Sequence, residues 1–237
     1  MIRPYTQDSD VSYTEGFFPT SEMVRWHPKD FVSLYLASDA TQSDGAAKLR
    51  TLIPEDKIIV SDKAFRLAEA KANAHVIGVF RKFTSVLNPK ANHLVMVNPS
   101  DMGNLGNAMR SLLAFGYHDL ALIEPCADYF NPKTVRASMG ALFHIRIESF
   151  TSFEDYRKKY PRPFYPFVLD TSRPLSKASF SLPCSLVFGN EATGLPPSIH
   201  NENNIRIEQS DEVDSLNLTT SIAIALYELR QHSSEKL

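Results

Sequence analysis

LVFGNEATGLP, residues 186–196, begins the stretch that decides the fold of this 237-residue chain. Its apolar run stops at Gly189-Asn190, as a buried strand stops at the edge of a parallel sheet. The short apolar segment Ile205–Ile207 ends in the same way, and Ser215 then opens a helix. The apolar side chains of that helix recur at about 3.6-residue spacing: Leu218, Ile222, Ala225, Leu226 and Leu229. We therefore expect two strand ends and one helix start to meet at a single sheet edge, where open α/β sheets bind ligands.

Length and composition are those of an ordinary globular chain with one large domain or two small ones. Hydrophobic residues make up 43% and charged residues 22%, and the formal net charge is −2. This charge argues against nucleic-acid binding by bulk charge but leaves room for a local basic patch. No apolar run approaches the roughly 20 residues of a membrane span, and the N-terminus lacks the apolar core of a signal peptide. We expect a cytoplasmic protein in which Cys126 and Cys184 are buried, reduced thiols.

Residues 1–85 are predicted to form a small α/β domain. Strands are expected at 31–37, 57–60 and 75–80, and helices at about 20–26, 46–52 and 64–70. Alternation of this kind predicts a mostly parallel sheet. The polar interval Arg81–Asn92, with Pro89 inside it, is the predicted linker. The second domain is then expected over residues 86–237.

A second alternating series begins at His93, and the nearly continuous apolar character of 93–98 suits the middle of a parallel sheet. Further strands are expected at 119–123, 144–147, 164–169 and 186–188, with helices at 104–115, 132–138 and 153–160. Asn131-Pro132 supplies a good N-cap and first-turn pair for the second of these helices. The predicted fold class is therefore α/β.

Several polar residues near the expected strand ends could carry chemistry. Arg110 lies about 130° from the apolar stripe of its helix, so it faces outward, as an ordinary solvated arginine also would. Glu191 directly follows a strand end, and its carboxylate could accept hydrogen bonds from a ligand or simply sit in a surface turn. Ser215 and Asn217 could line a site or only cap the helix that follows them. Asn104 lies at a strand-to-helix turn whose Gly-Asn-Leu-Gly sequence weakly resembles a phosphate-binding loop.

Basic residues form two groups that could contact a phosphate backbone. The first is the stretch Arg157, Lys158, Lys159 and Arg162, which a solvated helix end explains equally well. The second is a possible basic face on the N-terminal domain with Arg25, His27, Lys29, Lys48 and Arg50. The seven histidines show no metal-binding spacing, so no metal site is expected.

Three segments occur in a characteristic order: Asn104-Leu-Gly-Asn-Ala-Met-Arg110 with Phe115-Gly116, then Leu186-Val-Phe-Gly-Asn-Glu-Ala-Thr-Gly194, then Ser215-Leu-Asn-Leu-Thr219. Together they resemble the three signature motifs of the SpoU (TrmH) family, in the SPOUT superfamily of RNA methyltransferases. The intermediate stretch Val135-Arg-Ala-Ser-Met-Gly-Ala141 is also similar to this family. The resemblance covers roughly residues 93–231.

This resemblance implies a parallel sheet whose C-terminal part is threaded into a trefoil knot, although knots are otherwise almost absent from proteins. It also implies S-adenosylmethionine as cofactor, a homodimer with sites near the subunit interface, and methyl transfer to a ribose 2'-hydroxyl of rRNA or tRNA. The implied catalytic positions are Arg110, Asn104, Glu191, Ser215 and Asn217. The implied cofactor-binding positions are Leu186, Phe188, Gly189, Asn190, Gly194, Ile207 and Leu216. The expected RNA-binding positions are Arg136 and Ser138, with Arg25, Lys48 and Arg50 on an N-terminal domain that resembles small RNA-binding domains.

One departure from the family pattern bears on the cofactor. After Ile207 the family usually has Pro-Met, where this chain has Glu208-Gln209. A non-catalytic RNA-binding or assembly factor is therefore the alternative interpretation, and a dinucleotide-binding oxidoreductase is a more remote one. The role of Arg110 also has two readings, a proton acceptor or a phosphate anchor. A guanidinium stays protonated in proteins, which favours the anchor.

Overall fold

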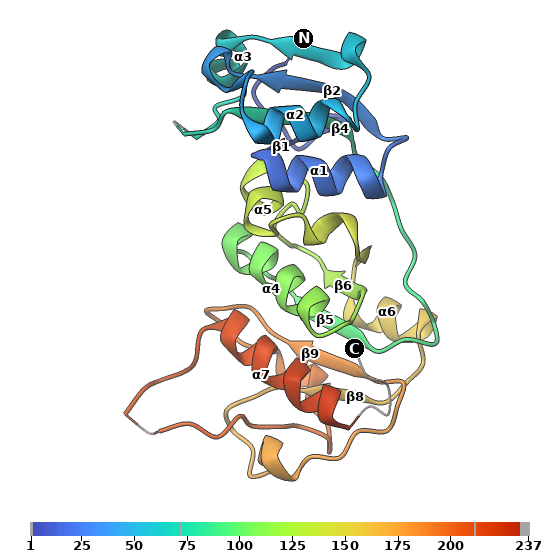
Figure 1. The fold of residues 1–237 in the computed structure, drawn as a ribbon. Coiled ribbons are helices and arrows are strands. Elements are labelled where there is room, and N and C mark those ends of the chain that lie inside the picture. The colour runs from blue at the N-terminus through green and yellow to red at the C-terminus, as the bar shows by residue number, and fades with distance from the viewer. Residues whose placement is uncertain (1, 72, 211, 233–237) are drawn as a thin grey trace. The chain divides into compact units, whose positions relative to one another are not determined.

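The computed structural model describes residues 2–71, 73–210 and 212–232. The chain divides into two compact units. Figure 1 shows its elements coloured by residue number. Unit 1 contains the residues up to Phe83 together with Asp128–His144, and unit 2 contains Thr84–Ala127 together with the residues from Ile145 onward. The predicted segments 1–85 and 86–237 differ from these units mainly in residues 128–144.

Unit 1 is built on a four-stranded sheet with the strand order β1-β4-β2-β3. Its strands are β1 (Val11–Glu15), β2 (Phe31–Leu36), β3 (Ile58–Val60) and β4 (Val76–Arg81). Its helices are α1 (Phe17–Trp26), α2 (Asp44–Arg50), α3 (Asp62–Leu67) and α5 (Pro132–Ala137), with short 3-10 turns at Ser38–Ala40, Glu55–Lys57 and Ala141–Phe143.

The prediction of a mostly parallel sheet is wrong for this unit. Strand β4 pairs antiparallel with both β1 and β2, and only β2 and β3 are parallel. The prediction missed β1 because two of its three buried residues, Ser12 and Thr14, are polar and give no apolar signal. Thr14 is satisfied inside the unit, since its Oγ1 lies 2.7 Å from that of Thr20 and accepts the Gly78 backbone N–H at 3.1 Å.

Residues 128–144 pack with unit 1 through polar and aromatic contacts. The Asn131 side chain caps α5 by accepting the Lys133 N–H at 2.9 Å, and Pro132 occupies the first turn, as predicted. Arg136 on this helix donates to both carboxylate oxygens of Glu15, at 3.0 and 2.9 Å. Contacts between residues so distant in sequence leave no periodic signal, so a boundary drawn from local composition could not include them.

Unit 2 is built on a five-stranded sheet with the order β7-β6-β5-β9-β8, and every neighbouring pair is parallel. Its strands are β5 (His93–Val97), β6 (Asp119–Ile123), β7 (Arg146–Phe150), β8 (Phe164–Pro166) and β9 (Ser185–Phe188). Its helices are α4 (Met102–Ala114), α6 (Phe153–Lys159) and α7 (Leu218–Gln231), with short 3-10 turns at Leu175–Lys177 and Pro197–Ile199. Strands β5, β6 and β9 are buried along their whole length, as central strands of a parallel sheet must be. The predicted parallel α/β sheet is therefore confirmed here.

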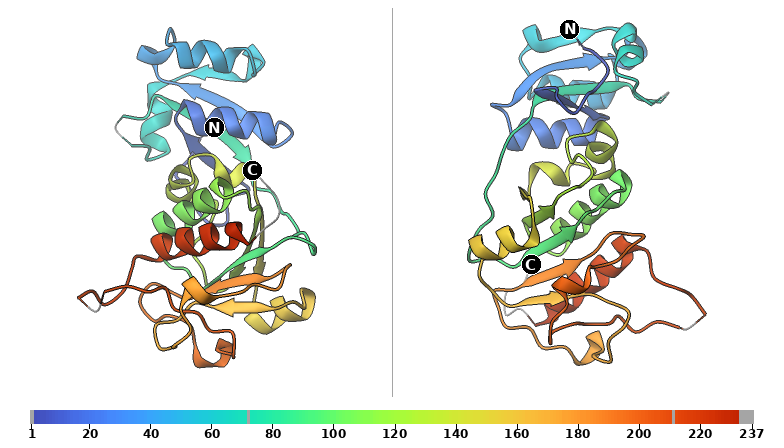
Figure 2. Two further views of the ribbon diagram at one scale, coloured as in Figure 1. Left: turned by 60° about the horizontal axis from the view of Figure 1, so that its bottom comes forward. Right: turned by 180° about the vertical axis from the view of Figure 1, so that it is seen from behind.

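Helices α4 and α7 lie side by side in unit 2 (Figure 2) and both begin at the sheet edge predicted to hold the site. The starts of these helices differ by two or three residues from the predicted starts at Asn104 and Ser215. Asp101 caps α4 by accepting the Asn104 N–H at 2.7 Å, so this helix starts at Met102. Asn217 caps α7 by accepting the Thr219 N–H at 2.9 Å, so that helix starts at Leu218 and not at Ser215.

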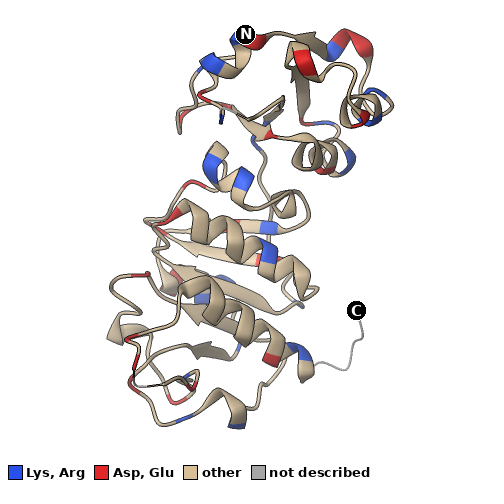
Figure 3. Cartoon of the chain, turned by 60° about the vertical axis from the view of Figure 1, so that its left-hand side comes forward, with Lys and Arg blue, Asp and Glu red and all other residues tan. Residues whose placement is uncertain are grey.

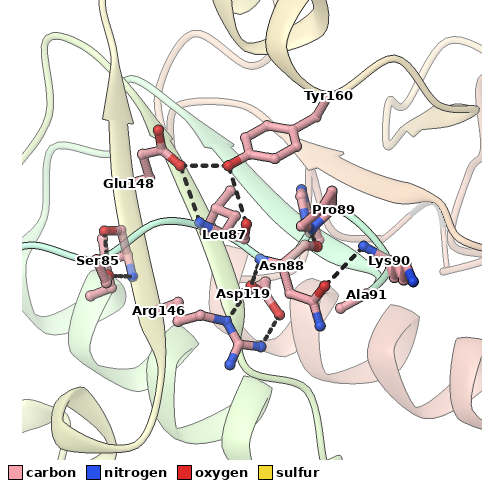
Figure 4. Close-up of polar contacts among 12 residues, drawn as sticks. Ser85, Leu87, Asn88, Pro89, Lys90, Ala91, Asp119, Arg146, Glu148 and Tyr160 are labelled. Carbon is pink, nitrogen blue, oxygen red and sulfur yellow. Dashed lines mark hydrogen bonds and ion pairs between the residues drawn. The ribbon is translucent and has the colours of Figure 1, made fainter.

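The C-terminal half of the predicted linker is fixed to unit 2 (Figure 4). The Leu87 N–H donates to Glu148 at 3.1 Å, and the Asn88 N–H donates to the buried carboxylate of Asp119 at 2.7 Å. Arg146 holds the same aspartate with two further hydrogen bonds, at 2.7 and 2.5 Å. Most of the predicted linker Arg81–Asn92, from Thr84 onward, therefore belongs to the second unit.

Candidate active site at the carboxyl edge of the parallel sheet

A cavity of about 340 Å³ opens at the carboxyl end of β9. Its apolar wall includes the rings of Phe167 and Phe188, which stack with centroids 4.4 Å apart. Its polar wall is the turn that follows β9, from Gly189 to Gly194, together with Gln209, Ser215 and Ser221. The remaining lining residues are Val168, Leu169, Ile205, Ile207, Leu216 and Leu218. An apolar cavity with a few convergent polar groups is typical of a small-molecule site.

Glu191 connects this cavity to the start of α4. Its Oε2 accepts the Ser100 N–H at 3.2 Å and the Ser100 hydroxyl at 3.1 Å. Its Oε1 accepts the Asp101 N–H at 3.4 Å and the Asn104 side-chain amide at 3.2 Å. The carboxylate therefore ties the turn after β9 to the turn after β5, as expected for neighbouring parallel strands whose carboxyl ends share one edge.

These hydrogen bonds determine the protonation state of Glu191. Burial raises the pKa of its carboxyl, but hydrogen bonds from its own backbone N–H, from Asn104 and from Ser100 lower it by more. The net pKa lies below the ordinary glutamate value. Glu191 is thus an ionised acceptor with its lone pairs occupied, which makes it a weak base.

The network continues to the start of α7. The Asn217 side-chain amide donates to Asn104 Oδ1 at 3.4 Å, while Asn217 Oδ1 caps the helix. Of the five predicted catalytic positions, Asn104, Glu191 and Asn217 are therefore in contact, and Ser215 lines the cavity beside them. Asn217 therefore caps α7 and also contacts Asn104, another of the predicted catalytic positions.

Arg110 lies apart from this cavity. It is exposed on α4, in a separate hollow formed with Asn107, Ser111, Ala114, Phe115 and Thr219. Thr219 belongs to the first turn of α7, so Arg110 faces the outer surface of the α4–α7 pair. Among the described residues it makes no hydrogen bond or ion pair, so its guanidinium is available to a ligand or partner.

Six of the seven predicted cofactor-binding positions line the cavity: Phe188, Gly189, Asn190, Gly194, Ile207 and Leu216. The exception is Leu186, which is buried inside β9 and reaches the sheet core instead. Side chains alternate along a strand, and only the last residue of β9 is at the edge.

The two glycines of the turn have different functions. A Cβ on Gly189 would lie 2.2 Å from the carbonyl carbon of Gly194 and 2.4 Å from the Leu195 nitrogen, so this position requires glycine for the tight turn itself. Gly194 has a φ of +67°, and a Cβ there would meet no atom within 4 Å. The backbone at Gly194 is therefore open to a ligand in the cavity.

Glu208 and Gln209, the departure from the family pattern, point in different directions. Gln209 lines the cavity, and its Nε2 donates to the Asp214 carbonyl at 3.3 Å. Glu208 turns to Ser176, whose hydroxyl donates to it, and this hydrogen bond lowers the pKa of the Glu208 carboxyl. Only Gln209 can therefore affect a bound cofactor directly.

The predicted RNA-binding residues lie in unit 1 and differ in availability. Arg25 and Lys48 are exposed, whereas Arg50 pairs with Glu55 and Arg136 pairs with Glu15. Ser138 is fully buried and donates its hydroxyl to the Val135 carbonyl at 2.7 Å, so it is not placed to contact RNA. Basic and acidic residues are both spread over the chain (Figure 3), and their numbers, 25 Lys and Arg against 27 Asp and Glu, give no excess of positive charge.

Ser100 belongs to the Glu191 network and was missed by sequence reasoning, whereas Asn190 was predicted as a cofactor-binding position. Asn190 donates to the Asn98 carbonyl at 2.8 Å and accepts the Ala192 N–H at 2.9 Å, so it shapes the turn around the cavity. The signal for Ser100 was the stretch Asn98-Pro-Ser-Asp101 directly after a predicted strand, a cluster of turn residues at the same sheet edge.

Within the described ranges no group of three or more His, Cys, Asp or Glu side chains could hold a metal ion. In the same part of the chain no helix has the length and apolar character needed to cross a membrane.

A parallel sheet with a mostly apolar cavity at its carboxyl edge defines an α/β protein that binds a small ligand at its strand ends. The model of the SpoU rRNA Methylase family matches residues 91–227, more than half of the chain, and the chain belongs to this family. The resemblance inferred from the three motifs is thereby confirmed.

Relatives extend this similarity over most of the chain. The 23S rRNA (guanosine(2553)-2'-O)-methyltransferase RlmP of Bacillus subtilis is 27% identical over 212 residues, which cover 83% of this chain and 86% of that protein. An AdoMet-bound rRNA methyltransferase from Sinorhizobium meliloti has a TM-score of 0.77 at 25% identity, covering 94% of this chain and 88% of that one. The SpoU methyltransferase AviRb from Streptomyces viridochromogenes shares the fold, with a TM-score of 0.80 at 20% identity over 94% of this chain and 89% of its own. The predicted enzyme class and cofactor, an S-adenosylmethionine-dependent RNA 2'-O-methyltransferase, agree with these relatives and are confirmed at the level of the family.

Proposed function

We propose that this chain transfers a methyl group from S-adenosylmethionine to a ribose 2'-hydroxyl of ribosomal RNA. The observation that carries the proposal is the Glu191 network, which joins all three motif segments beside a cavity of suitable character. Ribosomal RNA is favoured over transfer RNA because RlmP and the Sinorhizobium meliloti protein, whose similarity extends over most of this chain, are both rRNA enzymes by name.

The cavity fits the cofactor by its chemistry. Apolar walls with the open backbone at Gly194 suit a nucleoside, and the amides and hydroxyls of the polar wall suit an amino-acid moiety. When bound, S-adenosylmethionine supplies an electrophilic methyl group on a sulfonium. The residues that would hold it are the cavity positions Phe188, Gly189, Asn190, Gly194, Ile207 and Leu216, with Ser215 at the rim.

Glu191 acts as a positioning residue in this proposal. Its occupied lone pairs and lowered pKa suit a fixed anchor and not a proton acceptor. Its contact with Asn104, and that of Asn104 with Asn217, holds the starts of α4 and α7 against the cavity. Precise alignment of the reacting groups can supply several kcal/mol of the rate enhancement.

Arg110 serves as the RNA-phosphate anchor in this proposal. An exposed guanidinium without a partner among the described residues can hold an RNA phosphate bidentately, and the proton that the 2'-hydroxyl loses on methylation passes to solvent. A proton-acceptor role would require a neutral guanidinium, which proteins do not provide at neutral pH.

We further propose that two copies pair through the outer face of α4 and α7. Exposed residues recur on this face at helical spacing, with Arg110 and Ala114 on α4 and Ile224 and Tyr227 on α7. The Phe115 and Tyr227 rings meet edge-on at 6.1 Å across the two helices, giving a small apolar surface next to Arg110. A homodimer would cover this surface and bring the hollow around Arg110 to the interface.

The proposal includes three further properties: a trefoil knot, an RNA-binding role of the N-terminal unit and a cytoplasmic location. Family membership supports the knot, together with the unusual course of residues 205–206. Ile205 pairs with Phe167 and Arg206 pairs with Pro174, so this short segment runs between two other stretches of the chain. A chain that modifies ribosomal RNA would work in the cytoplasm.

Two measurements test the proposed function. Calorimetric titration with S-adenosylmethionine should show binding that does not change in Arg110→Lys, because Arg110 does not line the cavity. Methyl transfer to unmodified ribosomal RNA should fall in Arg110→Lys, whereas Lys158→Ala on the exposed face of α6 should retain it. Absence of cofactor binding with and without RNA would overturn the proposal and favour a non-catalytic assembly factor.

A further inference from the structure

Three large apolar side chains of unit 1 are exposed around helix α1. Phe18 and Trp26 on α1 are 57% and 59% exposed, and Met139 in the turn after α5 is 43% exposed. At about 100° per residue, Phe18, Trp26 and the intervening Arg25 fall within one arc of roughly 100°, opposite the buried face of the helix. We call these four residues the aromatic face.

Contacts within unit 1 hold the aromatic face together. A Cβ on Gly140 would lie 3.0 Å from Glu22 and 3.7 Å from the Phe18 ring, so the turn next to Met139 packs directly on α1. The Trp26 ring lies 4.5 Å from that of His144, tilted by 51°. Both aromatic residues are thus supported from one side, and their other sides are open.

The charges around the aromatic face favour an anionic ligand. Arg25 directly precedes Trp26 in the sequence and Lys29 follows it by three residues, and both side chains are exposed. The acidic residue Glu22 of α1 lies 3.7 Å from Arg25 and 2.6 Å from His144 Nε2, so its carboxylate is paired. A ligand that approaches here meets planar apolar surfaces flanked by cations.

We infer that the aromatic face binds an unpaired stretch of the RNA substrate by stacking its bases on Trp26 and Phe18. Aromatic surfaces interleaved with basic residues are the usual means of holding single-stranded nucleic acid. The two side chains are about 12 Å apart along the helix axis, a span that an extended strand bridges with a few nucleotides. This inference deepens the proposed function, since it names the feature of the RNA that unit 1 would read.

Trp26 is the only tryptophan in the chain, so the protein carries its own reporter. Titration with a short single-stranded oligoadenylate should quench the tryptophan emission of the unmodified protein. A double-stranded RNA of the same length should not, because its bases are already stacked. No quenching by the single strand, or equal quenching by the duplex, would overturn the inference.

Substitutions separate stacking from charge attraction, with binding followed by the anisotropy of a labelled single strand. Phe18→Ala and Trp26→Ala should each weaken binding roughly 5- to 150-fold at every salt concentration, with an unchanged salt dependence. Arg25→Ala should mainly reduce the steepness of the salt dependence. The matched control is Val60→Ala, which truncates another exposed apolar residue of unit 1, on β3, and should bind as the unmodified protein does.

Further measurements distinguish stacking from misfolding, from dimer formation and from failure of the proposed function. Trp26→Phe keeps a stacking ring and should retain most of the affinity, which distinguishes lost stacking from misfolding. A lower molecular mass of Trp26→Ala in solution would overturn the inference by showing that this face joins two copies of the chain. If no RNA is methylated but Trp26 is quenched as described, the proposed function fails and the stacking inference stands. If RNA is methylated with the same KM in Phe18→Ala and Trp26→Ala, the stacking inference fails alone.

Discussion

The Glu191 carboxylate accepts the Asn104 side-chain amide at 3.2 Å across a sequence separation of 87 residues. The same carboxylate accepts three donors from Ser100 and Asp101, so one side chain organises the whole start of α4. A carboxylate that accepts this many donors tolerates no substitution that brings donors of its own.

Glu191→Gln should therefore impair the site. The new amide group would face existing donors, and each lost hydrogen bond to a charged group is worth about 1.5–3 kcal/mol. We expect kcat/KM for RNA methylation to fall roughly 10- to 150-fold. The control is Glu202→Gln, an exposed glutamate of the same unit, which should retain full activity. Full activity in Glu191→Gln would mean that the network is dispensable.

Gly189→Ala should open the turn around the cavity. Its Cβ would overlap the backbone of Gly194 and Leu195, and an overpacked site costs about 1–3 kcal/mol. Binding of S-adenosylmethionine, measured by calorimetry, should weaken roughly 5- to 150-fold. Gly194→Ala meets no atom and adds only backbone strain of about 1 kcal/mol, so its loss should be smaller. Equal losses in the two variants would contradict this account.

Gln209→Met tests the departure from the family pattern. Gln209 belongs to the polar part of the cavity lining, and replacing its amide with an apolar side chain removes a polar group that a bound cofactor would have to desolvate. We expect cofactor affinity to rise several-fold, on the order of 1 kcal/mol. Glu208→Gln should leave cofactor affinity unchanged because Glu208 faces Ser176. An effect of Glu208→Gln as large as that of Gln209→Met would show that both side chains reach the cofactor.

His93 should make the stability of the chain sensitive to acid. Its Nε2 lies 2.9 Å from the Asn88 carbonyl and its Nδ1 lies 2.9 Å from the Tyr156 hydroxyl, so the buried ring is neutral. Burial lowers the pKa of His93 to about 4, below the ordinary value near 6.5. Between pH 6.5 and about 4 the unfolded chain therefore binds a proton at His93 that the folded chain does not. The free energy of unfolding should fall by about 3 kcal/mol as the pH is lowered across this range.

Urea unfolding at several pH values between 7 and 4 checks this prediction. His93→Gln removes the titrating group, so its stability should depend less on pH in this window, whatever its stability at pH 7. His75→Gln replaces an exposed histidine and should follow the unmodified protein. Parallel curves for all three proteins would show that His93 does not determine the acid response.

The sequence by itself determined the parallel sheet of unit 2, its order of strands and helices along the chain, and the edge where the site lies. Fully buried strands such as β5 and amphipathic helices such as α4 produce clear patterns of apolar residues in the sequence. The three motif segments lie where these strands end and these helices begin. The turn around Gly189, which lines the cavity, was located for the same reason. Strand β1 escaped because its buried Ser12 and Thr14 carry no apolar signal.

Only the tertiary structure decided which side chains meet. It joined Glu191 to Asn104 and Asn104 to Asn217, buried the side chains of Leu186 and Ser138, and separated Arg110 from the cavity. It also grouped residues 128–144 with unit 1 and gathered Phe18, Trp26 and Met139 around α1. Local periodicity reports the face on which a residue lies, whereas contacts between distant segments depend on how the sheet and its turns bring those faces together.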